Sequence, residues 1–104
     1  MYNKATIILL AFTLGACAGP EMTGRTVANE LLRKDTIQLL TPYAQARLDC
    51  NRIDSIRSNP VSASPDGVVV ESWQVSGCGN QASFSVRFTP SPSGGVDINI
   101  SLDQ

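Results

Sequence analysis

The sequence has 104 residues with eight Lys and Arg, nine Asp and Glu and no His, so its formal net charge at pH 7 is −1. A nearly neutral chain without a basic run or interleaved aromatic and basic residues is not typical of a nucleic-acid-binding protein, and we expect no such partner. The lack of histidine removes the commonest general base and the commonest metal ligand. We therefore expect neither an enzyme nor a protein that holds a metal or another cofactor.

The first 17 residues are typical of an export signal. Lys4 provides a positive charge, and the uncharged apolar stretch 5–14 follows it. A transmembrane helix needs about 20 apolar residues, so this stretch is too short to span a bilayer. The small residues that come next complete the pattern of a cleavable signal peptide.

The run Leu14-Gly15-Ala16-Cys17 resembles the lipobox of bacterial lipoproteins. The resemblance implies that the Cys17 thiol is diacylated, that the chain is cut before Cys17, and that the new amine also receives an acyl chain such as palmitate. Two or more acyl chains anchor a protein durably to a bilayer, whereas one chain binds only marginally. The alternative is an ordinary secretory signal that is cut near Ala16 or Ala18 and leaves Cys17 as a thiol.

The residue after Cys17 bears on the location of the protein. By resemblance to enteric lipoproteins, Asp at this position would favour the inner membrane, and this chain has Ala18 instead. We therefore expect a periplasm-facing protein anchored in the bacterial cell envelope, at the outer rather than the inner membrane. The expected organisation is a signal peptide over 1–16, the lipidated Cys17 with a tether over 17–25, and one small domain over 26–104.

Cys50 and Cys78 remain as a pair once Cys17 is assigned to lipid. An even pair in an oxidising compartment favours a disulfide bond. Closing a loop of about 28 residues would stabilise the domain by roughly 3 kcal/mol on the chain-entropy model. The alternative is two unpaired buried thiols.

The segment before Cys50 is predicted to contain one or two helices. Residues 18–25 are rich in Gly, Pro and polar side chains and are expected to be a tether. Thr26 is a plausible N-cap for a helix over 27–40, with the charge of Glu30 in the first turn.

A second helix is expected to follow the first. The pair Thr41-Pro42 favours a new start, because Thr caps well and Pro suits the first helical position. This short helix would run to about Leu48 and lead to Cys50.

The period of hydrophobicity changes from helical to alternating after residue 52. Apolar side chains at every second position alternate with polar ones in the clearest cases, which is the pattern of a half-buried strand. We expect strands over four segments: 53–57, 68–76, 82–88 and 96–102. Clusters of Gly, Pro, Ser and Asn between them predict turns. The predicted fold class is α+β, with one or two N-terminal helices packed on a four-stranded antiparallel meander.

Several residues with potential chemistry have simpler explanations. Lys34 lies on the polar face of the predicted helix, without the Ser-x-x-Lys spacing of a catalytic dyad. Asp49, Asp54 and Asp66 suit turns and solvated surface better than a calcium site, which takes about six to eight oxygens. The pair of glycines in the turn 77–80 lacks the following helix and lysine of a phosphate-binding loop.

Trp73 and Tyr43 are candidates for contact with a protein partner, because Trp and Tyr are enriched among the residues that dominate interface energies. For Trp73 we favour burial in the core beside the disulfide over contact with a partner.

The pattern Trp-x-Val-x-Gly-Cys-Gly over residues 73–79, with a cysteine upstream at Cys50, resembles a set of small uncharacterised bacterial envelope lipoproteins. The resemblance covers residues 43–88. It implies a disulfide between Cys50 and Cys78, and it implies no activity.

These observations lead to a hypothesis for function. We expect a non-enzymatic, membrane-tethered binding or accessory module whose partner is another envelope protein, since a meander leaves sheet edges free for strand addition. The alternative is an inhibitor of a secreted enzyme such as lysozyme, with the loops over 58–67 and 77–81 as its contact surface.

Overall fold

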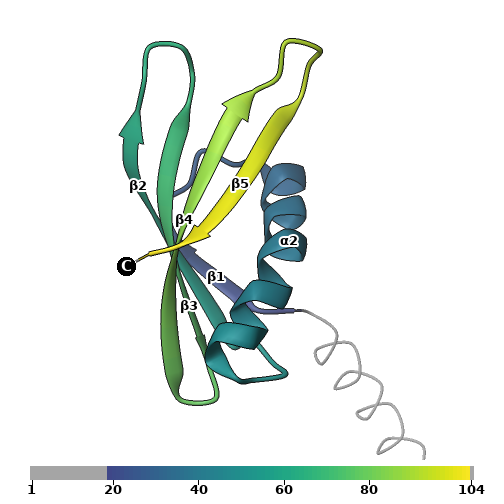
Figure 1. Cartoon of the computed structure of the whole chain (residues 1–104), viewed down its shortest axis with the longest axis vertical. Coiled ribbons are helices and arrows are strands. Elements are labelled where there is room, and N and C mark those ends of the chain that lie inside the picture. The colour runs from purple at the N-terminus through teal and green to yellow at the C-terminus, as the bar shows by residue number, and fades with distance from the viewer. Residues whose placement is uncertain (1–18, 104) are drawn as a thin grey trace, which may run out of the picture.

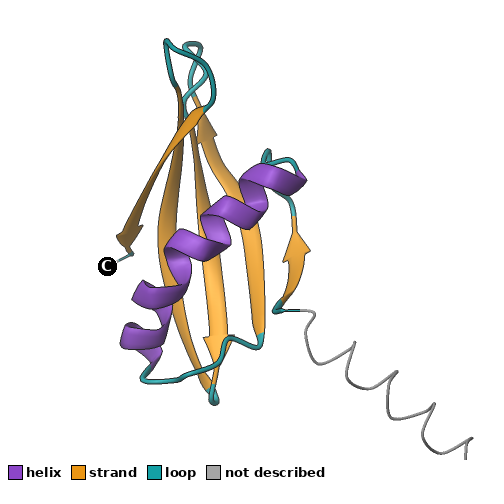
Figure 2. Ribbon diagram, turned by 90° about the vertical axis from the view of Figure 1, so that its right-hand side faces the viewer, coloured by secondary structure: helices purple, strands orange, loops and turns teal. Residues whose placement is uncertain are grey.

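Five strands form one sheet in the order β1-β2-β3-β4-β5, and a helix crosses one of its faces (Figures 1 and 2). The structure is a computed structural model that describes residues 19–103. Its elements are β1 (Glu21–Gly24), α2 (Glu30–Leu48), β2 (Ser55–Ala63), β3 (Val69–Gly77), β4 (Asn80–Pro90) and β5 (Val96–Leu102). The predicted α+β class is confirmed. The predicted signal peptide over 1–16 and the predicted lipidation site Cys17 lie outside the described residues.

Strands β2 to β5 form the predicted antiparallel meander, but the sheet has one strand more than predicted. β1 pairs in parallel with the first half of β2, with Glu21 opposite Ser55 and Gly24 opposite Ser58. Four residues with one apolar side chain show too little alternation to be recognised as a strand. The predicted tether over 17–25 is therefore too long, because the sheet already begins at Glu21.

Helix α2 begins later than predicted. Its N-cap is Asn29, whose side-chain oxygen accepts a hydrogen bond from the Leu32 amide at 2.9 Å, so the predicted cap at Thr26 is wrong. The Thr26 hydroxyl donates instead to the carboxyl group of Glu71 on β3 at 2.7 Å. Glu30 occupies the first turn, as predicted. The segment before the helix is thus held by the sheet rather than being part of the helix.

The two predicted helices are one, because α2 continues through Pro42 to Leu48. A proline inside a helix removes one backbone hydrogen bond and costs about 3 kcal/mol. Pro42 and Gln38, whose carbonyl would accept the missing bond, are both exposed, so water can reach that carbonyl. The opposite side of the helix buries every fourth residue: Thr36, Leu40, Ala44 and Leu48. Burial of this stripe against the sheet offsets the cost of the proline.

The core lies between α2 and the face of the sheet that the helix covers. Every second residue of the central strands points to this face, and the most buried large side chains are Leu40, Ile56, Trp73, Val75, Phe84, Val86 and Phe88. The intervening residues of these strands are mostly Ser, Gln, Asn, Thr and Arg. The strand alternation therefore separates a dry face from a wet one, as is usual for antiparallel sheets.

Strand β2 is longer than the predicted strand over 53–57. It runs to Ala63 with an irregularity in its pairing between Pro60 and Ser62. Proline cannot donate to a strand ladder and is found at edges and bulges. Pro60 lies past the end of the β1 pairing, where β2 has no neighbour on that side. A stretch whose Ser and Pro content predicted a loop is therefore a strand at this partly open edge.

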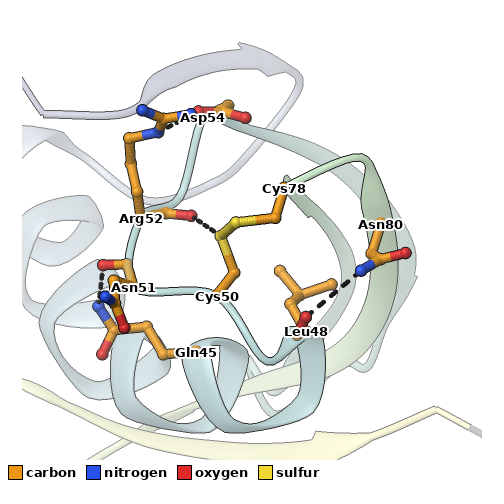
Figure 3. The surroundings of a disulfide bond; sticks show 8 residues. All are labelled: Gln45, Leu48, Cys50, Asn51, Arg52, Asp54, Cys78 and Asn80. Atoms are coloured by element: carbon orange, nitrogen blue, oxygen red, sulfur yellow. Dashed lines mark hydrogen bonds and ion pairs between the residues drawn. A yellow bond between two sulfur atoms is a disulfide. The ribbon is translucent and has the colours of Figure 1, made fainter.

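Cys50 and Cys78 form a disulfide bond, as predicted, with their Cα atoms 5.9 Å apart (Figure 3). Cys78 and Gly79 have φ values of 52° and 76°, so they form the type I′ turn that joins β3 to β4. A side chain at Gly77 would place its Cβ 2.5 Å from the Arg52 carbonyl oxygen, which explains the glycine. The bond fastens the chain that leaves α2 to this end of the sheet.

Candidate functional site

An apolar groove runs between α2 and strand β5, the last strand of the sheet. Its volume is about 860 Å³, and its apolar lining residues are mainly Leu39, Pro42, Tyr43, Ala46, Ile100 and Leu102. Helix α2 crosses the sheet obliquely, as Figure 2 shows, and contacts β3, β4 and β5. The two walls of the groove are thus the exposed side of a helix and the outermost strand.

The side chains along this groove are unusually exposed for large apolar residues. The exposed fractions are 48% for Leu39, 60% for Tyr43 and 40% for Leu102. Exposed apolar patches with a polar rim mark interaction sites in soluble domains. Tyr43, which the sequence singles out as a candidate for partner contact, lies in this groove.

A smaller hollow of about 430 Å³ extends the groove along β5 toward the start of that strand. It is lined by Asp35, Gln38 and Leu39 of α2 and by the first residues of β5, which include Asp97. Arg47 lines the opposite end of the groove, near Leu102. The combined groove is therefore acidic at one end and basic at the other.

The backbone of β5 has an open side along the full length of the strand. The Asp103 amide donates to the Ser83 carbonyl at 3.0 Å, and the Ser91 amide donates to the Gly95 carbonyl at 3.1 Å. Both bonds connect residues that stand opposite each other in the β4–β5 register, so the odd-numbered residues of β5 bond to β4. The backbone N–H and C=O groups of the even-numbered residues therefore point away from β4, toward the open edge of the sheet. These residues are Val96, Ile98, Ile100 and Leu102.

The two edges of the sheet differ in protection. β1 covers the first four residues of β2 at one edge, and β2 beyond it carries Pro60 and a pairing irregularity, which discourage strand addition. β5 contains no Lys, Arg or Pro in its seven residues, and Asp97 is its one charge. Among the strands that the structure describes, β5 is the one that offers a long, regular edge for strand addition.

Trp73 does not belong to this site. Its exposed fraction is 0%, and its indole N–H donates to the carboxyl group of Glu71 at 2.9 Å. The favoured interpretation, burial of Trp73 in the core, is what the structure shows, and contact of Trp73 with a partner is the interpretation that it contradicts. The physical reason is its position in β3, where Trp73 stands on the face that α2 covers.

Glu71 is the main polar residue of the core that sequence reasoning missed. It is fully buried, and its carboxyl group accepts hydrogen bonds from the Thr26 hydroxyl, from the Val27 amide at 2.7 Å and from Trp73. Arg87 on the neighbouring strand is exposed and stands opposite Val70, so it does not pair with Glu71. The sequence did contain a signal for the burial of Glu71: the alternation of β3 places Glu71 on the same face as Trp73.

The remaining acidic candidates have separate structural roles and do not line the groove. Asp49 is the left-handed C-cap of α2, and Asp54 forms an exposed ion pair with Arg52 at 2.9 Å. Hydrogen bonds from the Ser64 hydroxyl and the Val68 backbone lower the pKa of the Asp66 carboxyl group from its ordinary value. These roles are structural and belong to a helix end, a surface and a turn.

The described residues 19–103 were also searched for metal sites, membrane-spanning helices and other hollows. Within this range no three His, Cys, Asp or Glu side chains come together as a metal site would need, and no helix is long and apolar enough to cross a membrane. A polar hollow of about 510 Å³ lies beside β1 and β2, and the charged groups that line it are Arg25 and Arg57. It is part of the wet face of the sheet.

The loops expected to serve an enzyme inhibitor do not form one surface. Residues 58–63 belong to β2, and the remaining turn at 64–68 lies at the opposite end of β3 from the turn at 77–80 (Figure 1). Nine residues of strand separate them, which is about 30 Å. The turn at 64–68 instead lies at the same end of the sheet as the β4–β5 turn.

The chain was compared with family models, with curated proteins and with solved structures, and none of them matches it.

Proposed function

We propose that this protein is a lipid-anchored lipoprotein of the bacterial cell envelope that faces the periplasm and acts by binding protein rather than by catalysis. The lipobox-like run ending in Cys17 supports the anchor, and Ala18 supports the outer membrane. The chain has no histidine, and Lys34 is exposed on α2. These features favour an accessory or binding module.

The observation that carries the binding function is the combination of the open β5 edge with the apolar groove beside it. An extended segment of a partner would bond to the outward N–H and C=O groups of Ile98 and Ile100. Every second side chain of that segment would then point into the groove between Leu39, Tyr43 and β5. Strand addition of this kind obtains affinity from the backbone and specificity from the side-chain pockets. The partner we propose is therefore an envelope protein with an extended segment that alternates apolar and polar residues.

Site-specific photocrosslinking in the native host tests this proposal. A photoreactive residue at Leu39 or at Tyr43 is expected to give covalent protein adducts, because both side chains are exposed at the groove. The matched control is Val61, which is 64% exposed and apolar but lies on β2 at the other edge of the sheet. Adducts at Leu39 and Tyr43 without adducts at Val61 support the proposal. Equal labelling at all three positions, or no adduct at the groove, contradicts it.

A further inference from the structure

We propose that the strand bound at the β5 edge is β5 of a second copy of this chain, so that two chains form a symmetric dimer with one continuous sheet. The inference rests on the proposed function, because it names the occupant of the same edge and groove. It is carried by four features of β5 and α2: the backbone register, the side-chain pairs, the charges at the groove ends and the exposed apolar residues of the helix.

The backbone register of β5 suits pairing with itself. Asn99 is the middle residue of the seven-residue strand, and a two-fold axis at Asn99 pairs all seven residues of one copy with all seven of the other. In this register Ile98 stands opposite Ile100 of the partner subunit. Both residues point their N–H and C=O groups outward, as an antiparallel ladder requires. If the register shifted by one residue, each even-numbered residue would stand opposite an odd-numbered residue of the partner. The backbone N–H and C=O groups of that odd-numbered residue are already bonded to its own β4, so no ladder could form.

The side-chain pairs in this register are compatible on both faces. On the face toward α2, Ile98 meets the partner's Ile100, and Val96 meets the partner's Leu102. On the other face, Asn99 meets its own copy, and Asp97 meets the partner's Ser101. No like charges stand opposite each other, which would be unfavourable in an antiparallel pair. A register shifted by two residues in either direction would pair only five residues of each β5, and in one direction it would place Asp97 opposite the partner's Asp103.

The charges at the ends of the groove are also complementary under this symmetry. Arg47 lies at the end near Leu102, whereas Asp35 of α2 lies at the end near Val96. Because the two-fold axis reverses the direction of the groove, the basic end of one copy faces the acidic end of the other. Each dimer would contain this match twice.

The exposed apolar residues of α2 fill the space that such a dimer creates. The helix contacts β3, β4 and β5, so the two helices would lie over the two β4 strands. Three strand spacings separate those strands, which is about 14 Å. Packed helices are about 8–10 Å apart, so large side chains are needed between them. Leu39 and Tyr43 project from α2 into this region.

The dimer would be closed rather than the start of a fibre. A two-fold interface uses the same surface on both copies, and here it uses both β5 edges. The outer edges of the ten-stranded sheet would then be the two β1 strands, which are short and followed by the irregular part of β2.

Substitutions at Ser101 test the proposed register, because Ser101 is exposed and stands opposite the partner's Asp97. Two copies of the full-length protein with different affinity tags are coexpressed, extracted in mild detergent and pulled down through one tag. Wild-type copies are expected to copurify. Ser101→Asp creates two repulsive pairs per dimer and should weaken association about two- to thirty-fold. Ser101→Lys creates two attractive pairs and should strengthen association.

Two further variants make the test specific. The double variant Ser101→Asp with Asp97→Lys restores opposite charges and should return association toward the wild-type level. Ser85→Asp is the matched control, because Ser85 stands beside Ser101 in the β4–β5 register but lies away from the edge. This control should associate like the wild type.

The outcomes separate the inference from the proposed function. If wild-type copies do not copurify, or if Ser101→Asp and Ser101→Lys behave alike, the dimer is wrong. If the dimer is wrong but Leu39 and Tyr43 still crosslink to another protein, the proposed function stands. Adducts of Leu39 and Tyr43 with a second copy of this chain support both.

Discussion

At the residue scale, Glu71 decides how the N-terminal segment meets the sheet. Its carboxyl group is fully buried and binds the Thr26 hydroxyl, the Val27 amide and the Trp73 indole N–H. A backbone amide and an indole N–H can act only as donors, so they need an acceptor at this position. One side chain therefore joins the segment before α2 to the middle of the sheet.

Glu71→Gln is expected to destabilise the fold by about 1–3 kcal/mol, because one amide N–H₂ group would face a buried donor without an acceptor. Chemical denaturation followed by circular dichroism measures the change. The neighbouring Ser72→Ala is the control, since Ser72 lies on the wet face and should change stability by less than about 0.5 kcal/mol. A Glu71→Gln protein as stable as the wild type would show that the three hydrogen bonds do not hold this segment.

At the scale of the element, α2 shows how tertiary burial overrides a local signal. Thr41-Pro42 is a good start of a helix, and sequence reasoning divided the helix there. The stripe from Thr36 to Leu48 keeps the helix continuous, because an interruption would uncover Ala44 and Leu48. The Thr41 hydroxyl also donates to the Ile37 carbonyl at 2.6 Å within the helix. A break at residue 42 would therefore lose more core contact than it would gain in backbone geometry.

Pro42→Ala is expected to stabilise the protein by about 2 kcal/mol, because alanine restores the helical hydrogen bond to Gln38 while the unfolded chain gains some freedom. The midpoint of urea denaturation measures this change. Ala46→Pro is the opposite control, since Ala46 lies one turn later on the same exposed side, and it should destabilise the helix. A loss of stability in Pro42→Ala would mean that the helix needs the proline for a bend.

At the scale of the whole molecule, the early start of β1 shortens the connection to the proposed anchor. From Cys17 to Glu21 the chain reaches at most about 14 Å. The start of β1 would therefore lie close to the bilayer. In the proposed dimer the two β1 strands begin at opposite ends of the sheet, so both anchors can reach one bilayer only if the sheet lies along it.

Cys17→Ser is expected to move the protein from the membrane fraction to the soluble fraction of the periplasm, because each acyl methylene buried in the bilayer contributes about 0.8 kcal/mol. Fractionation followed by an alkaline wash of the membranes measures this. The double variant Cys50→Ser with Cys78→Ser is the control, since it removes the disulfide but keeps Cys17 and should stay with the membrane. Cys17→Ser protein that still sediments after the wash would contradict the anchor.

The sequence by itself determined the alternation of β3, β4 and β5, the turns between them and the pairing of the two domain cysteines. These features have strong local causes: period-two hydrophobicity, Gly-rich turns and an even cysteine count. It also singled out Tyr43 as a candidate for contact with a partner. Only the tertiary structure decided the strand at Glu21–Gly24, the extension of β2 past Pro60 and the continuity of α2. Each of these depends on backbone groups or apolar surface supplied by another element, which no local pattern records. For the same reason the groove beside β5 was not visible in the sequence, since it forms between α2 and β5, which only the tertiary structure brings together.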